Sequence, residues 1–64
     1  MTLDRAKELL EIQVKMASGY NRNAAKLILV EVQNEHGQAA VDHLIRDMNL
    51  EQVFGFQPGQ TFKW

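Results

Sequence analysis

Residues 24–36 read AAKLILVEVQNEH, and this stretch decides the fold of the 64-residue chain. Its run Leu27–Val32 is rich enough in branched side chains to suit a strand, but an isolated strand would have nothing to pair with. The segment length, the alanine-rich start and the closing Gly37 favour a helix over about 23–36. Apolar residues lie nearly all round this helix, which is typical of the centre of an assembly.

The segment before it predicts another helix, over about 3–18, whose apolar face is too wide for one neighbour. Thr2 is a suitable N-cap, Gly19 suits the position after the last turn, and residues 19–23 read as the connecting turn. At 100° per residue the apolar side chains cover an arc of roughly 200°, about twice what docking on one neighbour requires. They are Leu3, Ala6, Leu9, Leu10, Ile12, Val14, Met16 and Ala17.

The second half of the chain predicts shorter elements. Residues 38–48 form an ordinary amphipathic helix, with apolar positions on one arc of about 140°. Asn49 either ends this helix or caps a short helical turn over about 50–54, which Gly55 stops. Residues 57–60, QPGQ, have the composition of a type II turn.

The C-terminal segment 56–64 is expected to be an extended aromatic tail, since four of the five aromatic residues lie in the last eleven positions. If this segment is extended, Phe62 and Trp64 point to the same side. Large rings are unfavourable in water, so we expect the tail to pack on the helices or on a second subunit. Phe56, Phe62 and Trp64 are the residues predicted to contact a further protein partner.

These elements predict an all-α protein: three helices, a short fourth helical turn and the tail, in a single domain spanning residues 1–64. The first two helices carry more apolar surface than three short helices can bury when they pack in one layer. A two-fold homodimer, the commonest oligomer, would bury the surplus, and we prefer it to a different partner protein because it requires no second gene product. The predicted dimer interface consists of Leu9, Ile12, Met16, Leu27, Ile28 and Val32.

Composition narrows the class of protein further. The net charge is −1 and there is no cysteine, so no disulfide framework supports the fold. The longest aliphatic run, residues 27–30, is too short to span a membrane. Charges from Asp4 onward interrupt the apolar core that a signal peptide would need. We therefore expect a soluble, cytoplasmic protein.

A small group of acidic and histidine residues has the chemistry of a metal site but not its spacing. The group consists of Glu31, Glu35, His36, Asp42 and His43. In each of its two acid–histidine pairs, residues 35–36 and 42–43, the two members are adjacent in sequence, so their side chains point about 100° apart. Metal sites in helical bundles instead use a Glu-x-x-His spacing. No metal ligand is therefore predicted, although the sequence leaves open whether these residues form some other site. We expect Glu31 to pair with Arg5 or Arg22, or to lie at the rim of the interface.

The predicted function is a small non-enzymatic protein-interaction or regulatory module that acts as a homodimer. The sequence has no Ser/His/Asp pattern, phosphate loop, nucleotide fingerprint or cysteine nucleophile, so no catalytic or cofactor-binding residue and no cofactor is predicted. The alternative is a nucleic-acid-binding regulator that uses basic residues of the first half. Residues 1–26 carry five basic and three acidic residues. Residues 38–51 are acidic on balance, so a recognition helix there would repel phosphate.

Overall fold

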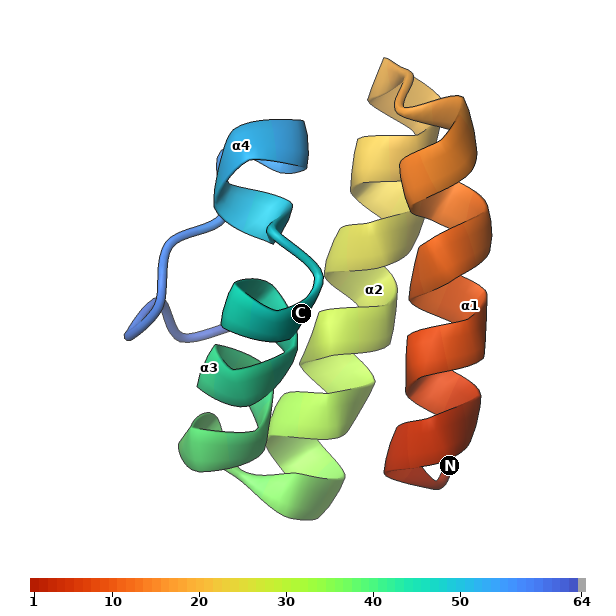
Figure 1. Ribbon diagram of the computed structural model, residues 1–64. Coiled ribbons are helices and arrows are strands. Elements are labelled where there is room, and N and C mark those ends of the chain that lie inside the picture. Colours follow the sequence, from red (N-terminus) through yellow and green to blue (C-terminus); the bar gives the residue numbers. More distant parts are fainter. Residues whose placement is uncertain (64) are drawn as a thin grey trace.

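The computed structural model describes residues 1–63, which form four helices and no strand. The helices are α1 (Leu3–Met16), α2 (Gly19–His36), α3 (Gln38–Asp47) and α4 (Leu50–Phe54). In Figure 1, α2 lies between α1 on one side and α3 with α4 on the other. The predicted all-α fold is confirmed. Within the described part of the chain, no helix combines the length and the apolar character needed to cross a membrane.

The connection between α1 and α2 is shorter than the sequence suggested. Ala17 ends α1 in a left-handed backbone conformation, with φ 47°. Ser18 then caps α2: its side chain accepts a hydrogen bond from the N–H of Asn21, whose side chain accepts one from the N–H of Ser18. The predicted turn over residues 19–23 is therefore wrong, because this capping box starts the helix at Gly19.

The breaks in the second half lie where the sequence placed them. Gly37 has φ 88° and separates α2 from α3, Asn49 has φ 57° and precedes α4, and Gly55 has φ 79° and ends it. Glycine adopts positive φ at little cost, and asparagine tolerates it better than most residues. In the turn at residues 57–60, the N–H of Gln60 donates a hydrogen bond to the Gln57 carbonyl at 3.0 Å. Gly59 has φ 90°, as the third residue of a type II turn requires.

The core lies where the helices and the tail meet, and the chain completes it alone. The buried apolar residues are Ala6, Leu10, Ala25, Leu29, Val30, Val32, Val41, Leu44, Ile45, Leu50, Phe54, Phe56 and Phe62. The accessible surface is 4017 Å², close to the value of about 4200 Å² typical of a compact monomer of this mass. Most of α2 is covered by α1, α3 and the tail of the same chain, although Tyr20 and Leu27 of this helix stay exposed.

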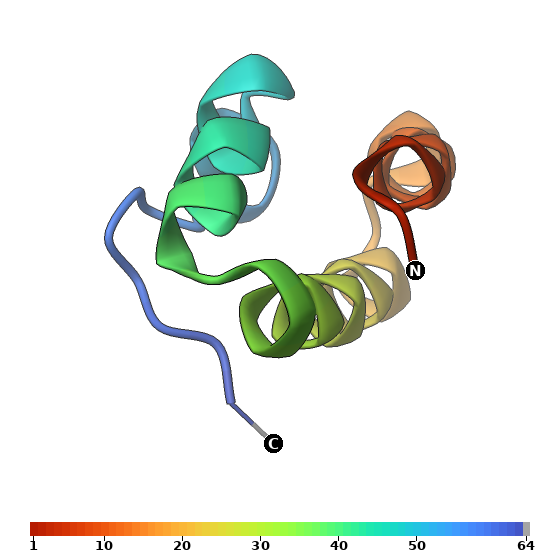
Figure 2. The same ribbon diagram turned by 90° about the horizontal axis from the view of Figure 1, so that it is seen from below.

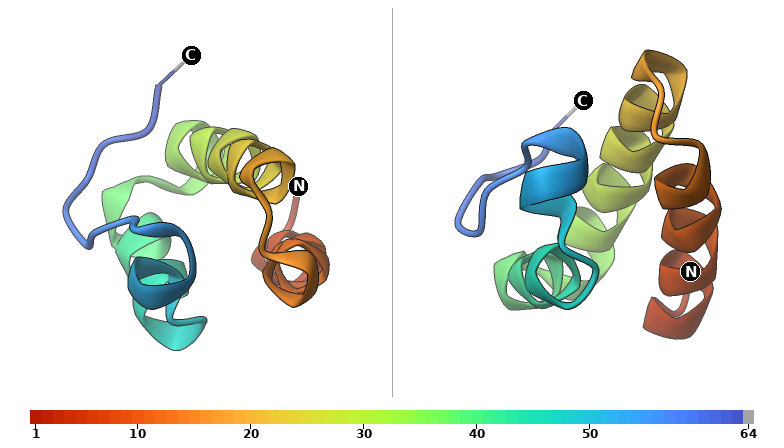
Figure 3. Two further views of the ribbon diagram at one scale, coloured as in Figure 1. Left: turned by 90° about the horizontal axis from the view of Figure 1, so that it is seen from above. Right: turned by 45° about the horizontal axis from the view of Figure 1, so that its top comes forward.

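The C-terminal tail turns back past α3 towards α2, as Figure 2 and the left view of Figure 3 show. Four polar contacts hold it there, one of them from the Thr61 hydroxyl to the side-chain oxygen of Gln38 at 3.3 Å. The N–H of Gly59 donates to Asp42 at 2.7 Å, and the side chain of Gln38 donates to the Gln60 carbonyl at 2.8 Å. The N–H of Phe62 also approaches the side-chain oxygen of Gln33 at 3.5 Å. The hydrogen bond from Gly59, with a second from Gln38, lowers the pKa of Asp42 below its ordinary value.

Candidate functional site

Large apolar side chains that remain exposed within residues 1–63 all belong to α1 and α2. They are Leu3 (38% exposed), Ile12 (51%), Met16 (69%), Tyr20 (90%) and Leu27 (50%). Single exposed apolar residues are common on protein surfaces, whereas a contiguous group of them marks an interaction site. The arrangement of the two helices decides which of these descriptions applies.

Polar contacts at both ends fix how α1 and α2 face each other. The side-chain nitrogen of Asn21 donates to the side-chain oxygen of Gln13 at 2.7 Å and lies 3.6 Å from the sulfur of Met16. At the opposite end, the ammonium group of Met1 donates to Glu35 at 2.6 Å. The two helices therefore run antiparallel and side by side, as Figure 1 shows.

Four of the exposed apolar residues share one side of this hairpin with half-buried Leu9. Leu9 and Met16 are one heptad apart on α1 with Ile12 between them, and Tyr20 and Leu27 are one heptad apart on α2. Ile12 lies about 120° around α1 from buried Ala6, and Leu27 about 160° around α2 from buried Ala25, both on the side away from α3. We call Leu9, Ile12, Met16, Tyr20 and Leu27 the outer face.

The predicted dimer interface overlaps with the outer face only in part. Leu9, Ile12, Met16 and Leu27 belong to it. Ile28 is half-buried and packs against the core. Val32 is fully buried in the chain's own core, about 140° around the helix from Leu27, so it offers no surface to a second subunit.

Tyr20 is the one outer-face residue that the predicted interface did not include. The sequence predicts a connecting turn at this position, whereas Tyr20 lies in the first turn of α2 and is the most exposed large apolar residue among those described. The signal that could have placed it is Ser18 followed three residues later by Asn21, which is a capping-box spacing with an amide in place of the usual Glu or Gln.

Two of the three aromatic residues predicted to contact a partner are instead part of the core. Phe56 and Phe62 are each 1% exposed, and their ring centres lie 5.3 Å apart in an edge-to-face arrangement. The guanidinium of Arg22 lies 4.8 Å from the centre of the Phe56 ring, and its Nε donates to the Phe54 carbonyl at 2.9 Å. A partner therefore cannot reach these rings without opening the fold. Trp64 lies outside the described residues.

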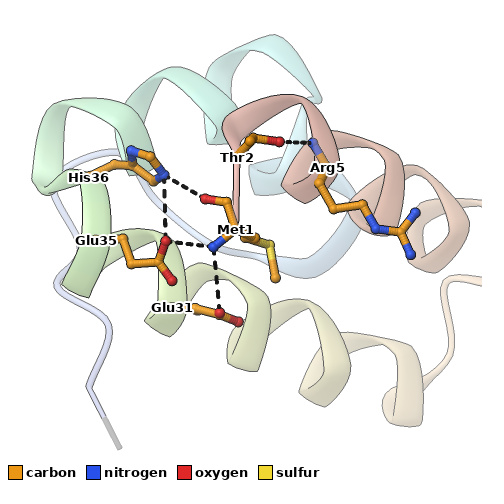
Figure 4. Close-up of polar contacts among 6 residues, drawn as sticks. All are labelled: Met1, Thr2, Arg5, Glu31, Glu35 and His36. Carbon is orange, nitrogen blue, oxygen red and sulfur yellow. Dashed lines mark hydrogen bonds and ion pairs between the residues drawn. The ribbon is translucent and has the colours of Figure 1, made fainter.

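A polar cluster joins the start of α1 to the end of α2 (Figure 4). The ammonium group of Met1 lies 2.6 Å from Glu35 and 3.8 Å from Glu31, and the Met1 carbonyl lies 2.9 Å from Nε2 of His36. The hydrogen bond to Glu35 raises the pKa of the ammonium group above 8.0 and lowers the pKa of Glu35 below 4.5. The predicted pairing of Glu31 with Arg5 or Arg22 is wrong, because the ammonium group is its neighbour.

This cluster predicts a characteristic pH dependence of stability. Because the pKa of Glu35 is lowered on folding, its contribution is present above pH 4.5 and is lost as the pH falls through the folded-state pKa. Because the pKa of the Met1 ammonium is raised, its contribution is present below pH 8.0 and is lost as the pH rises through the folded-state pKa. Glu35→Gln should therefore lower the melting temperature most between those limits.

Circular dichroism melts from about pH 3 to about pH 10 test this expectation. The difference between wild type and Glu35→Gln should shrink at both extremes. Exposed Glu51 on α4 makes none of the ion pairs found within residues 1–63, so Glu51→Gln is the matched control. A difference for Glu35→Gln that is equally large at every pH would contradict the assigned contact.

The acidic and histidine residues do not converge on a metal-binding geometry. In the described residues, no three His, Asp or Glu side chains are placed so that they could hold one ion. Asp42 is turned towards the tail turn, and His43 is exposed on α3. Glu31, Glu35 and His36 gather instead around the start of α1.

A groove of about 400 Å³ lies between α1 and α3. It is lined by Lys7, Glu11, Val14, Lys15, Asp47 and Met48. Lys7 forms an ion pair with Asp47 at 2.7 Å, and this contact raises the pKa of Lys7 and lowers the pKa of Asp47. The charged lining residues of this groove are two lysines and two carboxylates, and none of its lining residues carries a hydroxyl, thiol or imidazole group.

A smaller groove of about 240 Å³ lies beside the tail and is lined by Asn23, Lys26, Leu27, Val30 and Lys63. Leu27 thus belongs to the outer face and also lines this groove.

Comparisons of this chain with protein-family models, with curated proteins and with solved structures found no match.

Proposed function

We propose that this chain is a non-enzymatic protein-interaction or regulatory module that acts as a homodimer through its outer face. The observation that carries the proposal is the concentration of exposed apolar side chains on one side of the α1–α2 hairpin. Ile12, Met16, Tyr20 and Leu27 are each at least half exposed there. In Figure 2, α1 and the tail lie at opposite edges of the molecule.

A second copy of the chain would cover an area of the usual interface size. A stable interface covers about 800 Å² per subunit, which would be about a fifth of the 4017 Å² that the folded chain exposes. Two helices that present Leu, Ile, Met and Tyr side by side supply an apolar centre for such a contact. In a two-fold dimer the same residues are used on both subunits, so each apolar contact occurs twice.

The alternative function is nucleic-acid binding by the basic first half of the chain. The contacts of its basic residues support this function less well than the outer face supports a homodimer. Three of its five basic side chains are held within the chain: Arg5 by Glu8, Lys7 by Asp47, and Arg22 by the Phe54 carbonyl and the Phe56 ring. A phosphate-binding surface needs several cations directed outward together.

Sedimentation velocity over a dilution series tests the proposal. We expect wild-type protein to sediment as a particle of twice 7.3 kDa at high concentration and to dissociate on dilution. A single species of 7.3 kDa at every concentration would contradict the proposed homodimer. Retention on heparin at low salt that is lost by about 200 mM salt would instead favour the nucleic-acid alternative.

A further inference from the structure

The outer face of α1 has the spacing of a helix–helix seam. Leu9, Ile12 and Met16 are separated by three and then four residues, as are the a and d positions of a coiled coil. On α1, α2 lies on the side of Gln13, which accepts the hydrogen bond from Asn21. The seam therefore borders the α1–α2 contact on one side and open surface on the other.

Two opposite charges border the seam on its open side. Glu8 and Lys15 are seven residues apart, so they point in nearly the same direction and lie about 10.5 Å apart along the helix axis. Both are exposed. In the described residues Glu8 pairs only with exposed Arg5 on its own helix, at 3.5 Å, and Lys15 forms no ion pair.

The positions of these charges make the seam complementary to itself in one direction only. Glu8 precedes Ile12 by four residues, and Lys15 follows it by three. When two such helices pack antiparallel about Ile12, Glu8 of each lies opposite Lys15 of the other. In a parallel pair, Glu8 and Lys15 would instead face the opposite edge of the partner's seam, which carries the uncharged Gln13.

We propose that a second copy of the chain docks on α1 in the antiparallel direction, with Glu8 paired to the partner's Lys15 at both ends of the seam. This inference rests on the proposed homodimer and adds its direction and the charges that select the partner. The apolar seam supplies the affinity, and the two symmetric ion pairs set the direction and discourage other pairings.

Charge reversal tests this arrangement without disturbing the core. Glu8→Lys places Lys opposite Lys at both ends, and Lys15→Glu places Glu opposite Glu. Each variant alone should dimerise about tenfold more weakly than wild type at low salt, since each reversal converts two attractive pairs into repulsive ones. An equimolar mixture of the two variants should dimerise at least about tenfold more tightly than either alone, because both ends then join Lys to Glu.

Sedimentation velocity of wild type, each variant and the mixture measures these affinities, and circular dichroism confirms that helicity is retained. The double variant carrying both reversals in one chain should regain the wild-type affinity. In about 1 M salt the differences between variants should disappear.

The possible outcomes separate this inference from the proposed function. If wild type dimerises but the mixture gains nothing over the single variants, the antiparallel pairing is wrong and the homodimer stands. If wild type is a monomer throughout the dilution series, both the pairing and the proposed function are wrong.

Discussion

Replacing Phe62 by alanine is expected to lower the free energy of unfolding by about 3–5 kcal/mol, as truncation of a buried phenylalanine does. Phe62 is 1% exposed and packs edge-to-face on Phe56, which in turn contacts Phe54 with ring centres 5.8 Å apart. A domain of this size has a total stability of roughly 3–10 kcal/mol. Phe62→Ala should therefore remove a large part of the stability of the chain.

Urea titration followed by circular dichroism measures this effect. Lys63→Ala is the matched control, because Lys63 is adjacent in sequence and exposed, and it should leave the midpoint nearly unchanged. Phe62→Leu should fall between the two, since it keeps most of the buried volume. An unfolding midpoint for Phe62→Ala equal to that of wild type would show that the tail is not part of the core.

Ile12→Glu should abolish dimerisation while the fold survives. Ile12 is 51% exposed in the single chain, and glutamate is a good helix former, so the monomer tolerates the change. In the dimer, burial of an isoleucine side chain contributes about 1.5–3 kcal/mol, and the two-fold symmetry makes the loss occur twice. The dissociation constant should rise by at least about 100-fold.

Leu3→Glu is the matched control for this prediction. Leu3 is also an exposed apolar residue of α1, but it lies nine residues from Ile12, on the opposite side of the helix. It introduces the same charge away from the outer face and should leave dimerisation intact. Equal loss of dimerisation in both variants would indicate a general effect of charge and contradict the assignment of the interface to the outer face.

The sequence was most informative where a break has a local cause. Gly37 and Gly55 adopt positive φ and separate the helices where they were expected, and α4 matches its predicted range of 50–54. The observed start of α2 lies four residues before the predicted one, because a glycine such as Gly19 is typical of the end of a helix. The side chains of Ser18 and Asn21 make that glycine the first residue of the next helix instead.

Contacts between distant segments were much less predictable. The aromatic density of the tail indicated that it packs on something, but not that Phe56 and Phe62 fill the core of their own chain. Val32 is buried in the same cluster as these rings, so it offers no surface to a second subunit, which its apolar side chain alone could not reveal. The neighbour of Glu31 depends on where the start of α1 meets α2, which no local pattern encodes.

Methyl NMR spectra recorded over a dilution series test most directly the claim that two copies meet through the outer face. The account predicts concentration-dependent shifts for the methyl groups of Leu9, Ile12, Met16 and Leu27, which lie on that face. Buried Val41 and Ile45 of α3 should be unaffected. Spectra that are identical at every concentration, or shifts confined to α3 and the groove beside it, would contradict the account.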